Sequence, residues 1–126
     1  MNADDAEDFD TIDHRLVALV ERLVELTAAS KMSWEYVSAE DLFAHSLNGV
    51  SIQVYARDGD GRSPYILELK NSAGVIIEKF LTSEPQGPVQ QVLAGKVASL
   101  YTVARREALQ VGAILDMLIA ELAISD

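Results

Sequence analysis

The sequence predicts an α+β domain, in which helices pack on one face of an antiparallel sheet. Three observations carry this prediction: helical periodicity near the start of the chain, period-two alternation with turn signals through the middle, and helical periodicity again from residue 88 onward. The expected order is an N-terminal helix, a four-stranded antiparallel meander, and a long or kinked C-terminal helix, or a helix pair, on one sheet face. One domain is expected over 11–126, preceded by a disordered acidic tail over 1–10.

Composition fits one globular domain and excludes several functions. The chain has 126 residues, of which 49% are hydrophobic and 24% are charged. Its formal net charge of −10 disfavours binding to nucleic acid or to an anionic membrane surface. The absence of cysteine excludes disulfides and thiolate chemistry. The start of the chain lacks the pattern of a signal peptide, and Asp116 and Glu121 interrupt the last apolar segment, so we expect a cytoplasmic protein.

The first helix is expected from about residue 11 to residue 30. Asp10 or Thr11 can cap it, and Asp13 then lies in its first turn, where a negative charge is favoured. Apolar residues recur there at alternating spacings of three and four, which is the pattern of an amphipathic helix. They are Ile12, Leu16, Leu19, Leu23 and Leu26.

The middle of the chain predicts two hairpins. Asn48-Gly49 lies between the alternating segments 42–47 and 50–56, which indicates a two-residue turn that pairs His45 with Ile52. Strands are also expected over 65–70 and 75–81, joined by a turn over 71–74 that ends in a left-handed glycine. A glycine bulge in that turn would place Leu69 opposite Ile77 and Tyr65 opposite Leu81. The reverse face of the sheet would then carry Ile66, Phe80, Ile76, Tyr55 and Leu42.

Helical periodicity resumes after the break over 83–88, and Pro88 suits a first helical position. One helix over 88–124 would be too long for a compact domain of this size, so either Gly112 kinks it or residues near Gln110 separate two helices. One apolar stripe, which is expected to cover the core, consists of Leu93, Val97, Leu100, Ala104, Val111, Leu115, Leu118 and Leu122. A second apolar surface, which needs a further partner, consists of Leu109, Ala113, Met117, Ala120 and Ile124.

No cluster of residues identifies a reaction, and no cofactor or metal is expected. His14 lies near Asp10 and Asp13, but two carboxylates and one imidazole at a helix start make a poor metal site. His45 is expected to be a core or interface residue. The segment 58–61 starts like a calcium loop, but Arg62, Pro64 and Leu69 occupy later ligand positions, so we interpret it as a turn.

Three further residues have both a structural and a functional interpretation. Arg105 and Arg106 could contact a carboxylate or phosphate, although pairing with nearby acidic residues, or a place beside the buried stripe, is the simpler explanation. Trp34 could belong to a binding site, although its position at a helix–sheet junction is typical of core.

Several spaced segments resemble a broad group of small uncharacterised bacterial α+β proteins. The resemblance rests on 16–26 followed by Lys31-Met-Ser-Trp34, on Phe43 and Leu47, and on Leu100-Tyr-Thr-Val-Ala-Arg-Arg106 before a final apolar helix. It implies the α+β arrangement and a bacterial cytoplasmic origin, and it brings no catalytic residues. The chain also resembles acidic, dimeric type III secretion chaperones, but those place a helix between strands where this chain has only turns.

We therefore expect a non-enzymatic interaction or regulatory module that forms a homodimer. The candidate seam is the second surface of the last helix, or the reverse sheet face with Ile66 and Phe80. An alternative is an acidic immunity, antitoxin-like or chaperone-like protein that masks a partner protein. A small-molecule sensor or enzyme would instead require a deep pocket lined by His45, Trp34 and tyrosines.

Overall fold

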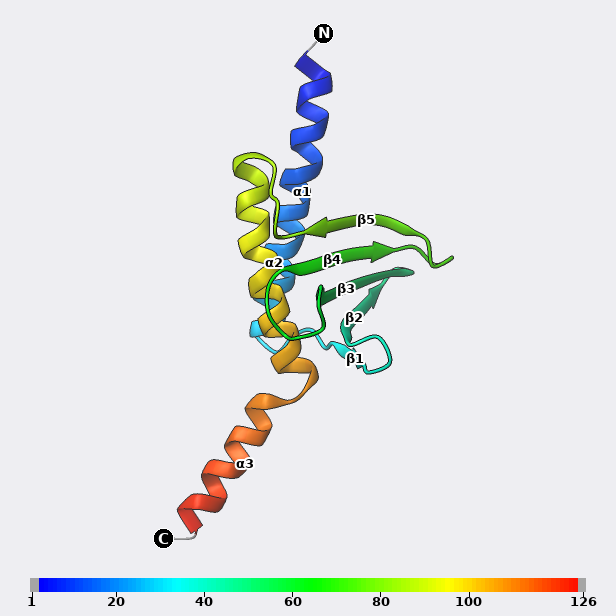
Figure 1. The fold of residues 1–126 in the computed structure, drawn as a ribbon. Helices are drawn as coiled ribbons and strands as arrows, with labels where there is room; N and C mark the ends of the chain where they lie inside the picture. The colour runs from blue at the N-terminus through cyan, green and yellow to red at the C-terminus, as the bar shows by residue number, and fades with distance from the viewer. Residues whose placement is uncertain (1–2, 125–126) are drawn as a thin grey trace.

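A computed structural model shows an α+β fold whose two long helices cover one face of a single antiparallel sheet (Figure 1). It describes the backbone of residues 3–124 and the side chains of residues 12–123. The elements in chain order are α1 (Ala3–Ala28), β1 (Glu35–Val37), β2 (Leu42–Leu47), β3 (Val50–Ala56), β4 (Tyr65–Lys70), β5 (Ile76–Leu81), α2 (Gly87–Ala108) and α3 (Val111–Ile124).

The sheet is a meander in which each strand pairs with the next, in the order β1-β2-β3-β4-β5. The predicted antiparallel meander is confirmed, but it has five strands instead of four. The additional strand, β1, has only 3 residues and places Tyr36 opposite Phe43. A strand this short contains too few positions for period-two alternation to be recognised.

The first helix begins earlier than the sequence indicates. The predicted start near residue 11 is wrong, because α1 begins at Ala3. The expectation of a separate acidic tail over 1–10 concerns a stretch whose side chains lie outside the described residues. Within α1, the apolar periodicity is confirmed where it meets the core, since Leu16 and Leu23 are buried, whereas Ile12 is 51% exposed.

The β2–β3 hairpin is confirmed with the predicted register. His45 lies opposite Ile52 and Leu47 lies opposite Val50. Asn48 and Gly49 have φ values of 51° and 78°. Positive φ at both positions is the geometry of the tight turn that matches the twist of the flanking strands.

The β4–β5 hairpin has the predicted turn but a different register. Gly74 has a φ of 81°, and its backbone N–H donates to the Asn71 carbonyl over 2.9 Å. The strands then pair Leu67 with Phe80 and Leu69 with Glu78, not Leu69 with Ile77. The irregularity falls between Leu69 and Lys70, inside the ladder instead of in the turn. Because a slip of one residue exchanges the two faces of a strand, Phe80 faces the helices.

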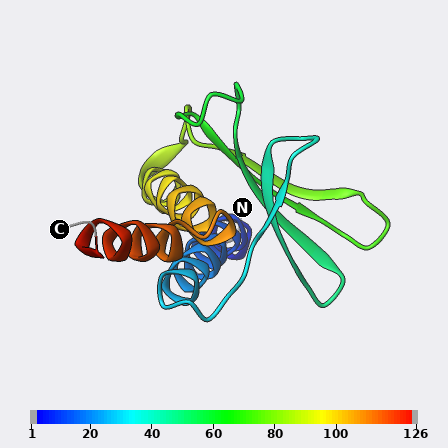
Figure 2. The same ribbon diagram turned by 90° about the horizontal axis from the view of Figure 1, so that it is seen from below.

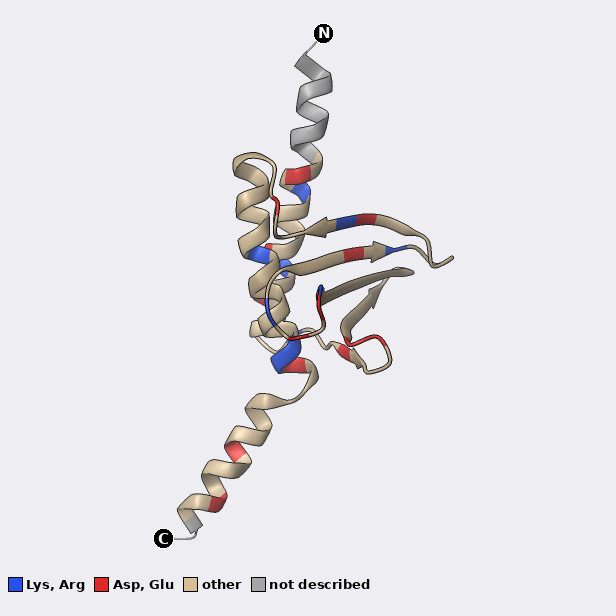
Figure 3. Ribbon diagram, viewed as in Figure 1, with Lys and Arg blue, Asp and Glu red and all other residues tan. Residues whose placement is uncertain are grey.

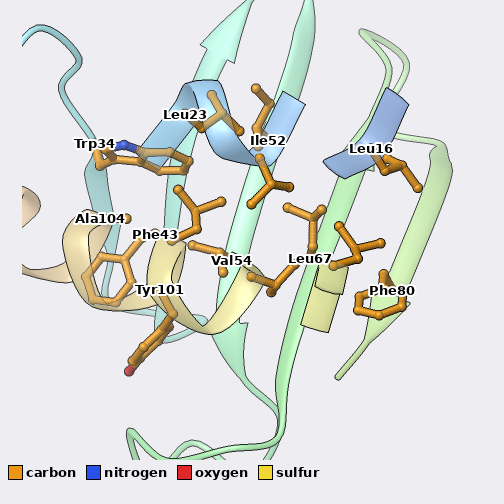
Figure 4. Close-up of a cluster of buried hydrophobic side chains, with 14 of the residues drawn as sticks. Leu16, Leu23, Trp34, Phe43, Ile52, Val54, Leu67, Phe80, Tyr101 and Ala104 are labelled. Carbon is orange, nitrogen blue, oxygen red and sulfur yellow. The ribbon is translucent and has the colours of Figure 1, made fainter. Parts of the chain in front are cut away.

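The core lies between the sheet and the pair α1 and α2, as Figure 4 shows. In α2 the predicted stripe is confirmed, since its residues point inward and are almost fully buried: Leu93, Val97, Leu100 and Ala104. They pack against side chains of β2, β3 and β4, including Phe43, Val54 and Leu67. α1 packs mainly along α2, so the two helices form one layer over the sheet.

The last apolar segment consists of two helices, not one kinked helix. α2 ends at Ala108, Gln110 has a φ of 58°, and α3 starts at Val111. This left-handed residue turns the chain, and α3 leads away from both the sheet and the helix pair (Figures 1 and 2). Gly112, the alternative position for the kink, lies inside α3.

Candidate functional site: the apolar arm and its groove

Helix α3 is an exposed apolar arm. Its large apolar side chains are about half exposed or more, from 45% at Ile114 to 70% at Leu122. Among the described elements, only α2 makes extensive contact with it, at its base. The expectation that Leu115, Leu118 and Leu122 cover the core is therefore wrong. Periodicity identifies the residues that share a face, but α1 and α2 form the helix layer over the core, and α3 leads away from it.

The arm has two apolar faces of unequal size. At about 100° per residue, Ile114, Leu115, Leu118 and Leu122 lie on the same side, and Ile119 extends this side. We call these five residues the wide stripe. The second surface carries Ala113, Met117 and Ala120, and Asp116 and Glu121 border it. Figure 3 shows these two acids as the only charged bands on the described part of the arm.

The structure separates the seven predicted interface residues. Ala113, Met117 and Ala120 are exposed on the arm, and Met117 is 53% exposed. Leu109 is half-buried against the core at the end of α2, and the side chain of Ile124 lies outside the described residues. Ile66 lies on the reverse face of the sheet but is only 6% exposed. Phe80 is a core residue, so its predicted place on the reverse face is wrong.

A groove of about 610 Å³ lies where the arm leaves the body. Thr27, Ala28 and Ser30 form its α1 side, and Val103, Arg106 and Glu107 form its α2 side. The arm contributes Val111, Gly112 and Leu115. The wide stripe therefore continues directly into a concave surface of the body, and Leu115 belongs to both.

Hydrogen bonds fix the walls of this groove. The backbone N–H of Trp34 donates to Glu107 Oε1 over 2.6 Å, which ties the segment after α1 to the end of α2. The buried indole N–H of Trp34 donates to Thr27 Oγ1 over 2.9 Å. The interpretation of Trp34 as a core residue is confirmed, since only 5% of it is exposed. Together these contacts link the ends of α1 and α2 through Trp34.

The reverse face of the sheet carries a hydrogen-bonded cluster instead of a bare apolar surface. Glu68 is buried there, accepts a hydrogen bond from the Tyr55 hydroxyl over 2.9 Å, and lies 3.6 Å from Lys79 Nζ and 3.9 Å from Lys70 Nζ. Burial first, and then the hydrogen bond to Glu68, raise the pKa of Tyr55 to about 12. Because these groups satisfy one another, we place the stronger candidate interface on the arm.

The two histidines considered for metal binding or catalysis, His14 and His45, lie on different elements, α1 and β2. His45 projects toward Trp34, with ring centroids 5.8 Å apart, and its Nδ1 lies 2.8 Å from the Ser33 carbonyl oxygen. Nδ1 is therefore the protonated nitrogen and donates to that carbonyl. His14 lies on α1, far along the chain from His45. Within the described side chains, no three His, Asp or Glu residues are grouped as metal ligands.

Comparison with known proteins gave no relative. No protein-family model matches the chain. No curated protein and no solved structure matches it either. The described helices include none with the length and apolar character that crossing a membrane requires.

Proposed function

We propose that this protein is a non-enzymatic interaction module that forms a homodimer through α3. The observation that carries the proposal is the exposure of the wide stripe, which reaches 65% at Ile119 and 70% at Leu122. Monomeric proteins rarely expose a contiguous apolar patch larger than a few hundred Å². A second copy supplies an equal apolar stripe, as the self-complementary interface of a symmetric dimer requires.

The energetics favour a contact that includes the groove. Full burial of a Leu, Ile or Met side chain contributes roughly 1.5–3 kcal/mol, so burying the exposed half of five such residues in each of two copies contributes on the order of 8–15 kcal/mol. Association costs about 4–15 kcal/mol in lost translational and rotational freedom, so pairing of the two arms alone is marginal. An arm that also enters the groove of its partner buries Val103 and Val111 as well, and this extra area makes a stable dimer attainable.

The positions of the acidic residues favour the wide stripe as the seam. Asp116 and Glu121 lie outside this stripe, so two arms that meet along it need not bury a carboxylate. The second surface, with Met117 at its centre, lies between these two acids. A seam there would bring the negative charges of two copies close together.

The proposal is tested by measuring the molar mass in solution with light scattering at tens of micromolar protein. We expect a dimer for the unaltered chain and a monomer for Leu118→Asp, with the unfolding free energy of the Leu118→Asp monomer unchanged because Leu118 is already 47% exposed. The matched control is Met117→Asp, since Met117 is exposed to a similar degree, 53%, on the second surface of the same helix.

Each outcome has a distinct meaning. If Met117→Asp dissociates the dimer and Leu118→Asp does not, the seam is the second surface. If the unaltered chain is a monomer, the homodimer proposal is wrong.

Salt provides an independent check. Each copy carries a net charge of −10, so screening should strengthen self-association. Attraction between the acidic surface and a basic partner protein would weaken with salt instead.

A further inference from the structure

A second pocket, which shares Arg106 with the groove, lies where the β3–β4 loop approaches the last turns of α2. Its volume is about 360 Å³. Arg62 and Asp60 line it from the loop, Tyr65 from the start of β4, and Tyr101, Arg105 and Arg106 from α2. Three arginines from two segments far apart in the sequence thus line one space.

The charge balance of this pocket is the reverse of that of the chain. The chain has 20 acidic and 10 Lys or Arg residues, yet three arginines and one aspartate line the pocket. Within the described part of the chain, the ion pairs with an arginine use only Arg22 and Arg57. The prediction that Arg105 or Arg106 pairs with a nearby acidic residue is therefore not met there. The favourable interaction of a cation with a helix C-terminus explains their place in the last turn of α2, but it does not explain Arg62.

The walls of the pocket are held in place by the core. Tyr101 is 7% exposed and its ring stacks on Tyr65, with centroids 4.5 Å apart. Figure 4 shows the hydroxyl of Tyr101 pointing away from the buried cluster. The Tyr65 hydroxyl reaches the Gly61 carbonyl over 3.5 Å, and a Cβ at Gly61 would lie 3.8 Å from the Tyr101 hydroxyl. Burial raises the pKa of Tyr101 and the nearby Arg105 opposes that shift, so Tyr101 stays a neutral hydroxyl that can donate a hydrogen bond.

We propose that this pocket binds a small phosphate monoester that also carries hydroxyl groups. The planar guanidinium offers paired N–H donors that match the oxygens of a phosphate, and three of them can neutralise its two negative charges. The volume lies at the lower end of small-molecule sites. Asp60 repels a second anionic group but can accept a hydrogen bond from a ligand hydroxyl, which favours a sugar phosphate over a polyanion.

Isothermal titration calorimetry of the full chain tests this proposal with ribose 5-phosphate, inorganic phosphate, ribose and succinate. We expect saturable binding of ribose 5-phosphate, weaker binding of inorganic phosphate, and none of ribose or succinate. Arg62→Gln and Arg105→Gln should each weaken ribose 5-phosphate binding by about tenfold or more, since each removes a charge-assisted contact. The matched control is Arg57→Gln, because Arg57 belongs to the same loop but pairs with Asp58 over 3.2 Å.

All three arginines of this test have exposed side chains, so the variants should fold like the unaltered protein. The proposal is overturned if ribose 5-phosphate shows no saturable binding at millimolar concentration, or if succinate binds as tightly. It is also overturned if Arg57→Gln weakens binding as much as Arg62→Gln and Arg105→Gln do. None of these results bears on dimer formation by the arm, so the two proposals can fail separately.

Discussion

Helices α2 and α3 follow one another in the chain and are both rich in apolar residues, yet one is covered and the other is bare. In α2, Leu93, Val97 and Leu100 are fully buried, whereas in α3 Leu118 is 47% exposed and Leu122 is 70% exposed. Among the described elements, α1 and α2 pack on the sheet face that carries the core, and α3 leads away from it. The comparison teaches that an apolar stripe is buried only where a second surface remains available to receive it.

The largest expected effect is a loss of unfolding free energy, and it distinguishes the buried helix α2 from the exposed helix α3. Leu100→Ala should lower the free energy of unfolding by about 2–5 kcal/mol, because it leaves a cavity in a packed core. Leu118→Ala should change it by about 0.5 kcal/mol or less when the protein is dilute enough to be monomeric. Urea unfolding measured at two protein concentrations checks both values. Equal losses for the two variants in the dilute sample would mean that the arm is part of the core.

A smaller loss of stability is expected for a substitution in the wall of the groove. Thr27→Val should destabilise the protein by about 1–3 kcal/mol, because the buried indole N–H of Trp34 loses its acceptor. Thr27→Ser keeps the oxygen and is the matched control. Urea unfolding with tryptophan fluorescence reports both the stability and the environment of Trp34. A Thr27→Val variant as stable as Thr27→Ser would show that this hydrogen bond does not hold the helix ends.

The smallest effect concerns the reverse face of the sheet. The pKa of Tyr55 is raised from 10.0 to about 12, so the folded protein holds this proton more tightly than the unfolded chain does. The resulting contribution to stability is complete below about pH 10 and is lost as the pH rises toward 12. The difference in unfolding free energy between the unaltered chain and Tyr55→Phe should therefore shrink over this range. A difference that stays constant with pH would contradict the raised pKa.

Local signals in the sequence predicted local structure well. Asn48-Gly49 determined the register of β2 and β3, because turn geometry and alternation agree there. The predicted register of β4 and β5 was wrong although the predicted turn was correct. Nothing in 65–81 indicates that the irregularity in strand pairing lies inside the ladder and not in the turn. β1 was missed because it is held mainly by pairing with β2 and not by its own pattern.

The candidate sites also depend on contacts between distant segments, which local sequence signals do not predict. The sequence indicated that 109–124 carries more apolar surface than it can bury alone. It assigned Leu115, Leu118 and Leu122 of the wide stripe to the core, because periodicity contains no information about which surfaces remain free. The arginine pocket was not predicted as a unit. Arg62 and Arg105 belong to a loop and a helix that only the folded chain brings together, and neither segment contains a phosphate-binding motif.

The short joint around Gln110 has a geometric consequence. A rod of 14 residues that rises 1.5 Å per residue is about 21 Å long. In a dimer joined through two such helices, the globular parts of the two copies would lie well apart. The dimer would be elongated and would diffuse more slowly than a sphere of equal mass. Its span would depend on the backbone torsion angles of this one joint.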